Sequence, residues 1–265
     1  MVYYTVFTGA LVMMNTDTQI NNAPFVGVIM QQSGEPFSDA SLIGTNSVLY
    51  ATGLSGGTPP TANTLIGLVQ FTSPNNYAFN ADQSGNGTIS TQSDTGTFSV
   101  AANGRLTLTS SGSGGGHNPV IYLVKPGKAF LVGTDNSVTV GSFEPQSAGP
   151  FSDASMSGVF SFGSILPAEP NVDYQEGWVN FNAAGTVSGE SDNITLGSGP
   201  SVGGTFSQDY SVAANGRGTV FKTGLSTTPN VIFYVVSGTK AVLMKAYSGS
   251  GTQVSSNPGI SLAQK

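Results

Sequence analysis

One hairpin-like segment occurs three times in this chain of 265 residues and constrains its architecture more than any other feature. Each copy holds two short apolar runs joined by a turn, and the copies are residues 2–14, 120–132 and 232–244. The matching place in each copy is a tyrosine, with 118 residues from Tyr4 to Tyr122 and 112 from Tyr122 to Tyr234. Self-similarity at a long, nearly fixed period is typical of tandem copies of one folding unit. We therefore interpret the chain as an array of repeats.

Three further motifs recur at offsets of 110 to 114 residues. They are Pro-Phe-Ser-Asp-Ala-Ser at 36–41 and 150–155, Gly-x-Val-x-Phe at 67–71 and 177–181, and Val-Ala-Ala-Asn-Gly-Arg at 100–105 and 212–217. Small differences in offset are expected when turns vary in length and strands do not. We predict a partial repeat at 1–34, equivalent to the last three strands of a unit, and complete units at 35–148 and 149–265.

Within each unit, short runs rich in Val, Ile, Tyr, Phe and Thr alternate with clusters of Gly, Asn, Pro and Ser. Asn-Gly pairs at 103–104 and 215–216 lie between strand-like runs, and Asn-Gly is a strong hairpin signal because the turn needs positive φ. The pattern predicts an all-β protein with about eight strands in each unit. We expect two tandem antiparallel meander barrels or sandwiches, because closure removes exposed strand edges. A single larger β structure that uses all the strands is the alternative.

The composition excludes several kinds of site and partner. The net charge is −6 with only eight Lys and Arg, which excludes a basic patch for nucleic acid or an anionic membrane. The chain has no cysteine and His117 is its only histidine, which excludes disulfides, thiolate metal sites and a multi-histidine metal site. We expect no metal and no cofactor. No run approaches the about 20 apolar residues of a membrane helix, so we expect no membrane insertion.

The N-terminus shows no signal peptide, since Met1 leads directly into strand-like sequence. A low charged fraction of 8% and many Gly, Ser, Thr and Asn residues nevertheless favour an extracellular or cell-surface location for the parent protein. A truncated reading frame or an expressed fragment would reconcile the two observations.

The repeat motifs also resemble those of known proteins. Phe-Ser-Asp-Ala-Ser-Leu at 37–42, Ser-Val-Ala-Ala-Asn-Gly-Arg at 99–105 and the hairpin at 122–131 are similar to tandem β-repeats in large secreted bacterial surface proteins, notably of acidobacteria. The resemblance covers most of both units, although this chain begins inside a unit. Because such repeats are largely uncharacterised, the resemblance implies secretion and tandem architecture and assigns no catalytic residue.

The two arginines of the chain, Arg105 and Arg217, follow the two Asn-Gly turns at equivalent positions. Their planar guanidinium groups could grip a carboxylate or phosphate ligand at a barrel mouth. The structural alternative is an ion pair with a recurrent acid, from the pairs Asp39/Asp153 or Asp82/Asp192. Both interpretations remain open from sequence alone.

Candidates for catalysis are few. His117 lies in a Gly-rich loop and would need an activated nucleophile and an orienting acid to act as a base. Glu176, Glu190 and Asp192 cluster in the second unit, and a carboxylate pair at the right separation would suit glycoside hydrolysis. Asp82 opens an oxygen-rich segment that matches a calcium loop incompletely, since the closing glutamate is missing.

Aromatic side chains provide the remaining binding candidates. Tyr122, Tyr234 and Trp178 could form a platform that stacks against sugars, although aromatic residues in alternating strands also belong in cores. Strands in the partial repeat at 1–34 would need partners, which favours self-association by strand addition. Our first hypothesis is a secreted, non-enzymatic β-repeat protein with a structural, adhesive, or glycan- or small-molecule-binding role. The alternative is a metal-independent hydrolase with its site in a barrel mouth.

Overall fold

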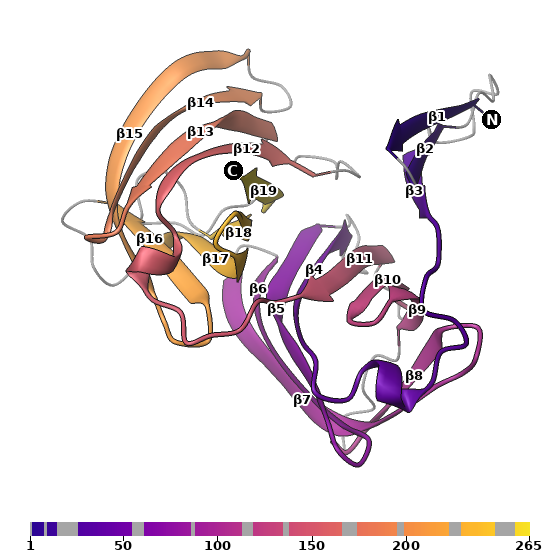
Figure 1. Ribbon diagram of the computed structural model, residues 1–265. Coiled ribbons are helices and arrows are strands. Elements are labelled where there is room, and N and C mark those ends of the chain that lie inside the picture. The colour runs from indigo at the N-terminus through magenta and orange to yellow at the C-terminus, as the bar shows by residue number, and fades with distance from the viewer. Residues whose placement is uncertain are drawn as a thin grey trace.

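The computed structural model describes residues 2–7, 10–14, 26–54, 61–85, 88–112, 119–134, 138–165, 174–194, 199–222, 229–246 and 258–265 (Figure 1). In this part of the chain the fold is all-β, apart from two short 3₁₀ turns. No described helix is both long and apolar enough to cross a bilayer.

Eight antiparallel strands close the first barrel, in which each strand pairs with its neighbours along the chain. These strands are β4 (Asn46–Leu54), β5 (Ala62–Thr72), β6 (Asn76–Gly85), β7 (Thr88–Val100), β8 (Arg105–Ser110), β9 (Val120–Lys125), β10 (Lys128–Val132) and β11 (Val138–Pro145). The barrel closes where β11 pairs with β4, from Val138 opposite Leu54 to Pro145 opposite Ser47.

The second barrel repeats this meander and closes where β19 pairs with β12. Its strands are β12 (Gly158–Ser164), β13 (Tyr174–Asn182), β14 (Thr186–Ile194), β15 (Ser201–Val212), β16 (Arg217–Lys222), β17 (Pro229–Ser237), β18 (Lys240–Lys245) and β19 (Ile260–Gln264). The prediction of two tandem eight-stranded antiparallel barrels is therefore confirmed, and the alternative of one larger β structure is not observed.

Each barrel has its own aromatic core, built from the inward-facing residues that alternate along each strand. Phe71 meets Phe98 edge to face in the first barrel, and Phe181 meets Tyr210 in the same way in the second; the ring centroids are 5.0 Å apart in both pairs. The predicted hairpin between β7 and β8 is present, with Gly104 at φ 82°.

Two short 3₁₀ helices, η1 (Asp39–Ser41) and η2 (Asp153–Ser155), precede the first strands of the two barrels. The Asp39 carboxylate accepts a hydrogen bond from the backbone amide of Val100 at 2.6 Å, and Asp153 accepts one from Val212 at 2.7 Å. This pair of recurrent acids therefore ties η1 and η2 to the turns at the ends of β7 and β15, and does not bind the recurrent arginines.

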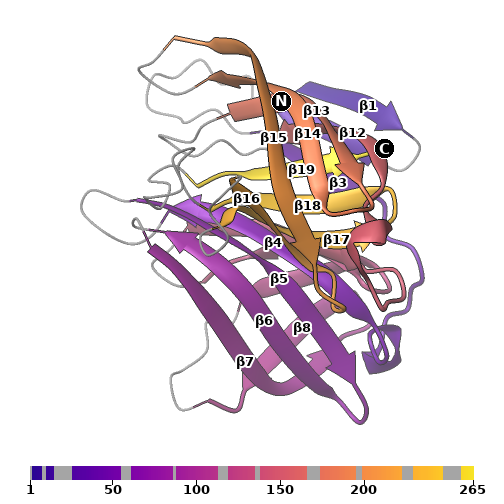
Figure 2. The same ribbon diagram turned by 90° about the vertical axis from the view of Figure 1, so that its left-hand side faces the viewer.

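The two barrels pack side by side through their outer surfaces (Figures 1 and 2). Strands β17 and β18 of the second barrel lie against β4 and β5 of the first. An apolar cluster of both barrels fills the contact, and its buried members are Val48, Ile66, Leu68, Ile232, Tyr234, Val236, Val242, Met244, Ala246 and Ile260. At its margin, the Lys240 ammonium forms an ion pair with the Glu144 carboxylate.

A three-stranded antiparallel sheet precedes the first barrel, formed by β1 (Val2–Phe7), β2 (Ala10–Met14) and β3 (Val26–Met30). It lies apart from both barrels (Figure 1), and its two outer edges, on β1 and β3, pair with no other described strand. The predicted three-strand partial repeat is thus present as an open sheet.

The connections that enter the two barrels are anchored in the same way. Gln32 donates from Nε2 to the carbonyls of Asn103 and Leu123, at 3.2 and 2.7 Å. Gln146 donates to the equivalent carbonyls of the second barrel, those of Asn215 and Val235, at 3.1 and 2.8 Å. Each glutamine thus fixes the preceding β unit relative to the barrel that follows it.

Candidate functional site

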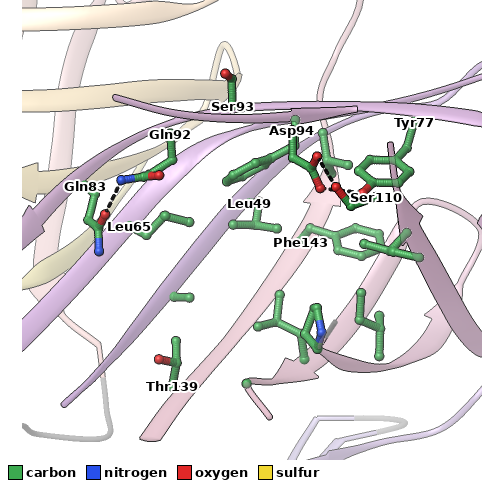
Figure 3. A pocket seen from close by; sticks show the side chains of 18 of the residues that line it. Leu49, Leu65, Tyr77, Gln83, Gln92, Ser93, Asp94, Ser110, Thr139 and Phe143 are labelled. Atoms are coloured by element: carbon green, nitrogen blue, oxygen red, sulfur yellow. Dashed lines mark hydrogen bonds between the residues drawn. The ribbon is translucent and has the colours of Figure 1, made fainter. Parts of the chain in front are cut away.

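The first barrel encloses a partly open cavity of about 650 Å³ (Figure 3), which reaches the end of the barrel at Gly112, Pro119 and Gly133, where its mouth lies. Its floor is apolar and includes the core side chains Val69, Phe71 and Phe143. Polar side chains line the wall nearer to the mouth. A hollow of this size and lining is typical of sites for small molecules.

Asp94 on β7 is the one acidic residue among the described residues that line the cavity. Its carboxylate accepts hydrogen bonds from the Tyr77 hydroxyl at 2.5 Å and from the Ser110 hydroxyl at 2.6 Å (Figure 3). It also accepts one from the backbone amide of Thr95 at 2.9 Å. Three donors from β6, β7 and β8 therefore converge on one carboxylate.

This arrangement shifts the acidity of both partners. Desolvation raises the pKa of Asp94, but the hydrogen bonds from Ser110, Tyr77 and the Thr95 amide outweigh it and bring this pKa below the ordinary value. Desolvation, together with the hydrogen bond to Asp94 and its negative charge, raises the pKa of Tyr77. Asp94 is therefore an ionised hydrogen-bond acceptor at neutral pH, and Tyr77 is a neutral donor.

A second polar group lies beside Asp94 on the same wall of the cavity. Gln92 donates from Nε2 to the Gln83 carbonyl oxygen at 2.7 Å, and Gln83 donates to the Asn63 carbonyl oxygen at 2.8 Å. Figure 3 shows Gln83 and Gln92 beside the Asp94 cluster, along the wall formed by β6 and β7. This wall thus carries uncharged amides next to one carboxylate.

The second barrel carries different residues at the equivalent positions. Asp94 lies opposite Phe79 on the neighbouring strand, whereas the corresponding pair in the second barrel is Phe206 opposite Gly189. Phe206 packs against the second core, and a Cβ added at Gly189 would come within 2.8 Å of its ring. An aromatic ring therefore occupies in the second barrel the place that the Asp94 carboxylate takes in the first.

We did not select Asp94 from the sequence. A usable signal was present, because an acid at an inward-facing position of one repeat is replaced by phenylalanine at the same position of the other. The convergence of Tyr77 and Ser110 on it depends on pairings across three strands.

The predicted binding residue Arg217 lies at the contact between the barrels. Its Nε and Nη2 atoms donate to the two oxygens of the Asp82 carboxylate, both at 2.7 Å. The Tyr234 hydroxyl donates to the same carboxylate at 2.8 Å. Asp82 is 2% exposed, so this bidentate ion pair joins β6 of the first barrel to β16 and β17 of the second.

The hydrogen bond to Asp82 raises the pKa of Arg217 further above its ordinary value. Burial, followed by the negative charge of Asp82, raises the pKa of Tyr234. Asp82 is also the residue that opened the calcium-like segment, and its carboxylate is taken up by these two donors. The described residues contain no group of three or more His, Cys, Asp or Glu side chains that could hold a metal ion.

The equivalent residues of the first barrel, Arg105 and Tyr122, lie on its outer surface and are exposed. No acidic side chain in the described part of the chain pairs with the Arg105 guanidinium. The two recurrent arginines therefore have different surroundings, although their cross-strand partners, Tyr122 and Tyr234, correspond.

The acidic candidates of the second unit lie together on the outer face of the second barrel. Glu176 on β13 faces Asp192 on β14, and Trp178 faces Glu190 in the next pair on the same face. Asp192 accepts a hydrogen bond from the backbone amide of Gly203 at 2.7 Å. These four side chains are thus outside the barrel and not in its mouth, and His117 lies outside the described residues.

No protein-family model matches the chain, and neither does any curated protein. Among solved structures, a kievitone hydratase from Nectria haematococca aligns over 85% of this chain and 91% of its own, with 8% identity and a TM-score of 0.28. A DUF3598-family protein from Nostoc punctiforme aligns over 84% and 95%, with 9% identity and a TM-score of 0.24. A porin-like protein from Bacteroides uniformis aligns over 82% and 94%, with 6% identity and a TM-score of 0.19. Similarities this low carry no argument about function.

Proposed function

We propose that this protein is a binding module whose first barrel takes up a small amphipathic molecule. The observation that carries the proposal is the cavity of about 650 Å³, with an apolar floor and a carboxylate at the mouth. Pockets for small molecules commonly have volumes of about 300 to 1,000 Å³ and a few convergent polar groups. The second barrel, with Phe206 in place of Asp94, would serve as a structural partner.

The charge state of Asp94 defines the chemistry of the ligand. An ionised carboxylate has room for about four hydrogen bonds, and three donors already bind Asp94. The remaining lone pair can accept a hydrogen bond from a donor group of the ligand, and the negative charge of the carboxylate repels an anionic ligand. The ligand is therefore expected to have an apolar body and an amine or hydroxyl head.

Hydrolysis, the alternative proposed from the sequence, has less support at this cavity. The Ser110 hydroxyl donates a hydrogen bond to the Asp94 carboxylate. Because the pKa of Asp94 is below its ordinary value, Asp94 is a weak base for activating that hydroxyl. Tyr77, with a raised pKa, is a correspondingly weak acid. A stable hydrogen-bonded wall suits binding better than acid–base chemistry.

Location and origin remain proposals that rest on the sequence. The low charged fraction and the repeat motifs support a bacterial protein that acts outside the cell or on its surface. Small molecules or glycans met in that environment are the corresponding ligand classes.

A pair of fluorescent probes with one fluorophore and opposite head groups tests the proposal. Dansylcadaverine has an amine head, and 11-(dansylamino)undecanoic acid has a carboxylate head. We expect the amine probe to bind at least about tenfold more tightly, which corresponds to about 1.4 kcal/mol. Asp94→Asn should remove that preference, whereas Asp209→Asn, on the exposed surface of the second barrel, should retain it.

A filling variant locates the binding. Asp94→Phe combined with Phe79→Gly places the cross-strand pair of the second barrel into the first and should abolish binding of both probes while the far-ultraviolet circular dichroism stays unchanged. Undiminished binding to this variant would show that the probes bind elsewhere, and the proposal would fail. Turnover of ester or glycoside substrates by the wild type but not by Asp94→Asn would establish the hydrolase instead.

A further inference from the structure

We propose that the outer face of β9–β11 in the first barrel is a docking face for another unit of this repeat, with Arg105 and Tyr122 binding an aspartate of that unit. We call this surface the open face. It consists of five side chains on β9–β11 and of the neighbouring arginine on β8: Val120, Tyr122, Phe130, Val132, Val140 and Arg105. The face lies on the outside of the barrel, separate from the ligand cavity.

The contact between the two barrels provides the template. In the second barrel the equivalent face is closed, because it packs against β4–β6 of the first barrel. Tyr234 is 3% exposed there and Met244 0%, whereas their counterparts Tyr122 and Val132 are 44% and 42% exposed. The same surface is therefore covered in one barrel and uncovered in the other.

The two faces also share their strand register. Arg105 pairs with Tyr122 across β8 and β9, as Arg217 pairs with Tyr234 across β16 and β17. Tyr122 pairs in turn with Phe130, and Tyr234 with Val242. The first barrel can therefore present a guanidinium and a phenol side by side on an apolar surface, in the arrangement that holds Asp82 in the second contact.

Charge complementarity identifies what such a face would bind. The face that docks onto the second barrel carries one buried carboxylate, Asp82, among the aliphatic side chains Val48, Ile66 and Leu68. Arg105 has no acidic partner in the described part of the chain, so the open face has the cation and lacks the anion. Exposed apolar surface around an unpaired arginine favours a partner that supplies both parts.

The open sheet β1–β3 indicates which part of a repeat unit would complete it as a barrel. It corresponds to β9–β11, whose outer edges pair with β8 and β4 in the closed barrel. Five strands of the β4–β8 type would pair with both free edges and close this sheet into a barrel. Since Gln32 anchors the sheet as Gln146 anchors the first barrel, those five strands would place their aspartate face over Arg105.

We therefore commit to one occupant: a five-stranded segment of this repeat with an aspartate at the position of Asp82. A second copy of the chain fits less well. Its barrels are already closed and offer no strand edge to β1–β3. A second copy is accordingly an outcome of the test.

Two extended chains supply such a five-stranded segment. The first places residues 35–119 directly before Val2, so that the added segment and residues 2–34 together form a complete unit. The second replaces residues 1–34 by residues 35–148, which reproduces the natural junction between the two units. The absence of cysteine from the protein allows a single labelling site in each chain, Val132→Cys in the original first barrel and not in the added segment.

The readout is the rate of maleimide labelling at position 132. We expect this thiol to react rapidly in the original chain and at least about tenfold more slowly in both extended chains, since buried thiols are inert. Met244→Cys in the original chain provides the buried reference, and Val202→Cys, at a position 75% exposed, should react rapidly in all chains. Arg105→Gln, or Asp82→Asn in the added segment only, should restore fast labelling at position 132.

Three results would overturn the proposal. In the first, both extended chains gain the strand content of a third barrel but the position 132 thiol reacts as fast as before. In the second, neither chain gains that strand content, which would mean that the partial sheet accepts no complement. In the third, the original chain itself becomes protected as its concentration rises and Asp192→Asn removes the protection, which would assign the face to a second copy.

Discussion

The buried ion pair between the barrels gives the sharpest test of how this molecule is held together. Arg217→Met keeps much of the length and apolar stem of the arginine but removes both hydrogen bonds to the Asp82 carboxylate. Asp82 is 2% exposed, so the variant leaves a charge in the contact with the Tyr234 hydroxyl as its remaining described partner. We expect the contact to weaken substantially.

The magnitude follows from the desolvation of the carboxylate. Removing one partner of a buried ion pair typically costs about 3 to 5 kcal/mol, because the other charge is left uncompensated. The Arg217 side chain is 35% exposed, so water can reach the vacated position and the lower end of that range applies. We expect a loss of about 3 kcal/mol in the free energy of unfolding, or about 150-fold in the unfolding equilibrium constant.

Urea unfolding followed by circular dichroism and by the fluorescence of Trp178, the single tryptophan, measures this loss. Arg105→Met is the matched control and should change stability by no more than about 0.5 kcal/mol, since that arginine is exposed and has no described acidic partner. The double variant Arg217→Met/Asp82→Asn should recover part of the loss, because the uncompensated charge is gone. A loss below about 1 kcal/mol for Arg217→Met, or no recovery in the double variant, would refute the reasoning.

Three further outcomes are expected. Because Asp94 has a lowered pKa in the folded protein, its ionised form stabilises the fold above the ordinary pKa of about 4, and this contribution is lost as the pH falls through the lowered value. Asp94→Asn should therefore lose less stability than the wild type between about pH 5 and pH 2, measured by urea midpoints; equal slopes would contradict this. Tyr210→Phe removes a hydroxyl within 3.0 Å of the carbonyls of Asp153, Met156 and Asn182 and should cost about 1 to 3 kcal/mol in thermal unfolding, whereas Tyr122→Phe should cost almost nothing. Gln146→Ala removes two hydrogen bonds to the second barrel and should speed proteolysis between the barrels, while Gln32→Ala should leave that segment as resistant as before.

The cavity of the first barrel and the filled position of the second show how one repeat can support two roles. The strand order is the same in both, whereas the cross-strand pair Phe79 and Asp94 of the first barrel is replaced by Gly189 and Phe206 in the second. A meander barrel tolerates this change because inward-facing positions are separate from the backbone ladder that closes the sheet.

The amino-acid sequence left open whether the strands form two units or one larger β structure, but by itself it determined the repeat and the strand and turn pattern. These depend on local preferences: alternating apolar residues select strands, and Asn-Gly turns such as that at Gly104 reverse the chain. It also singled out Arg105 and Arg217 as equivalent residues, and it named Asp82 among the possible acidic partners.

Only the tertiary structure decided which acid binds Arg217 and which arginine has no acidic partner among the described residues. Asp82 is 135 residues away in the chain and belongs to the other barrel, so no local pattern links the two. The convergence of Tyr77 and Ser110 on Asp94 likewise depends on how three strands are staggered around a closed barrel. Both sites result from distances between separate elements, and these distances are set by packing across the whole fold and not by any single segment.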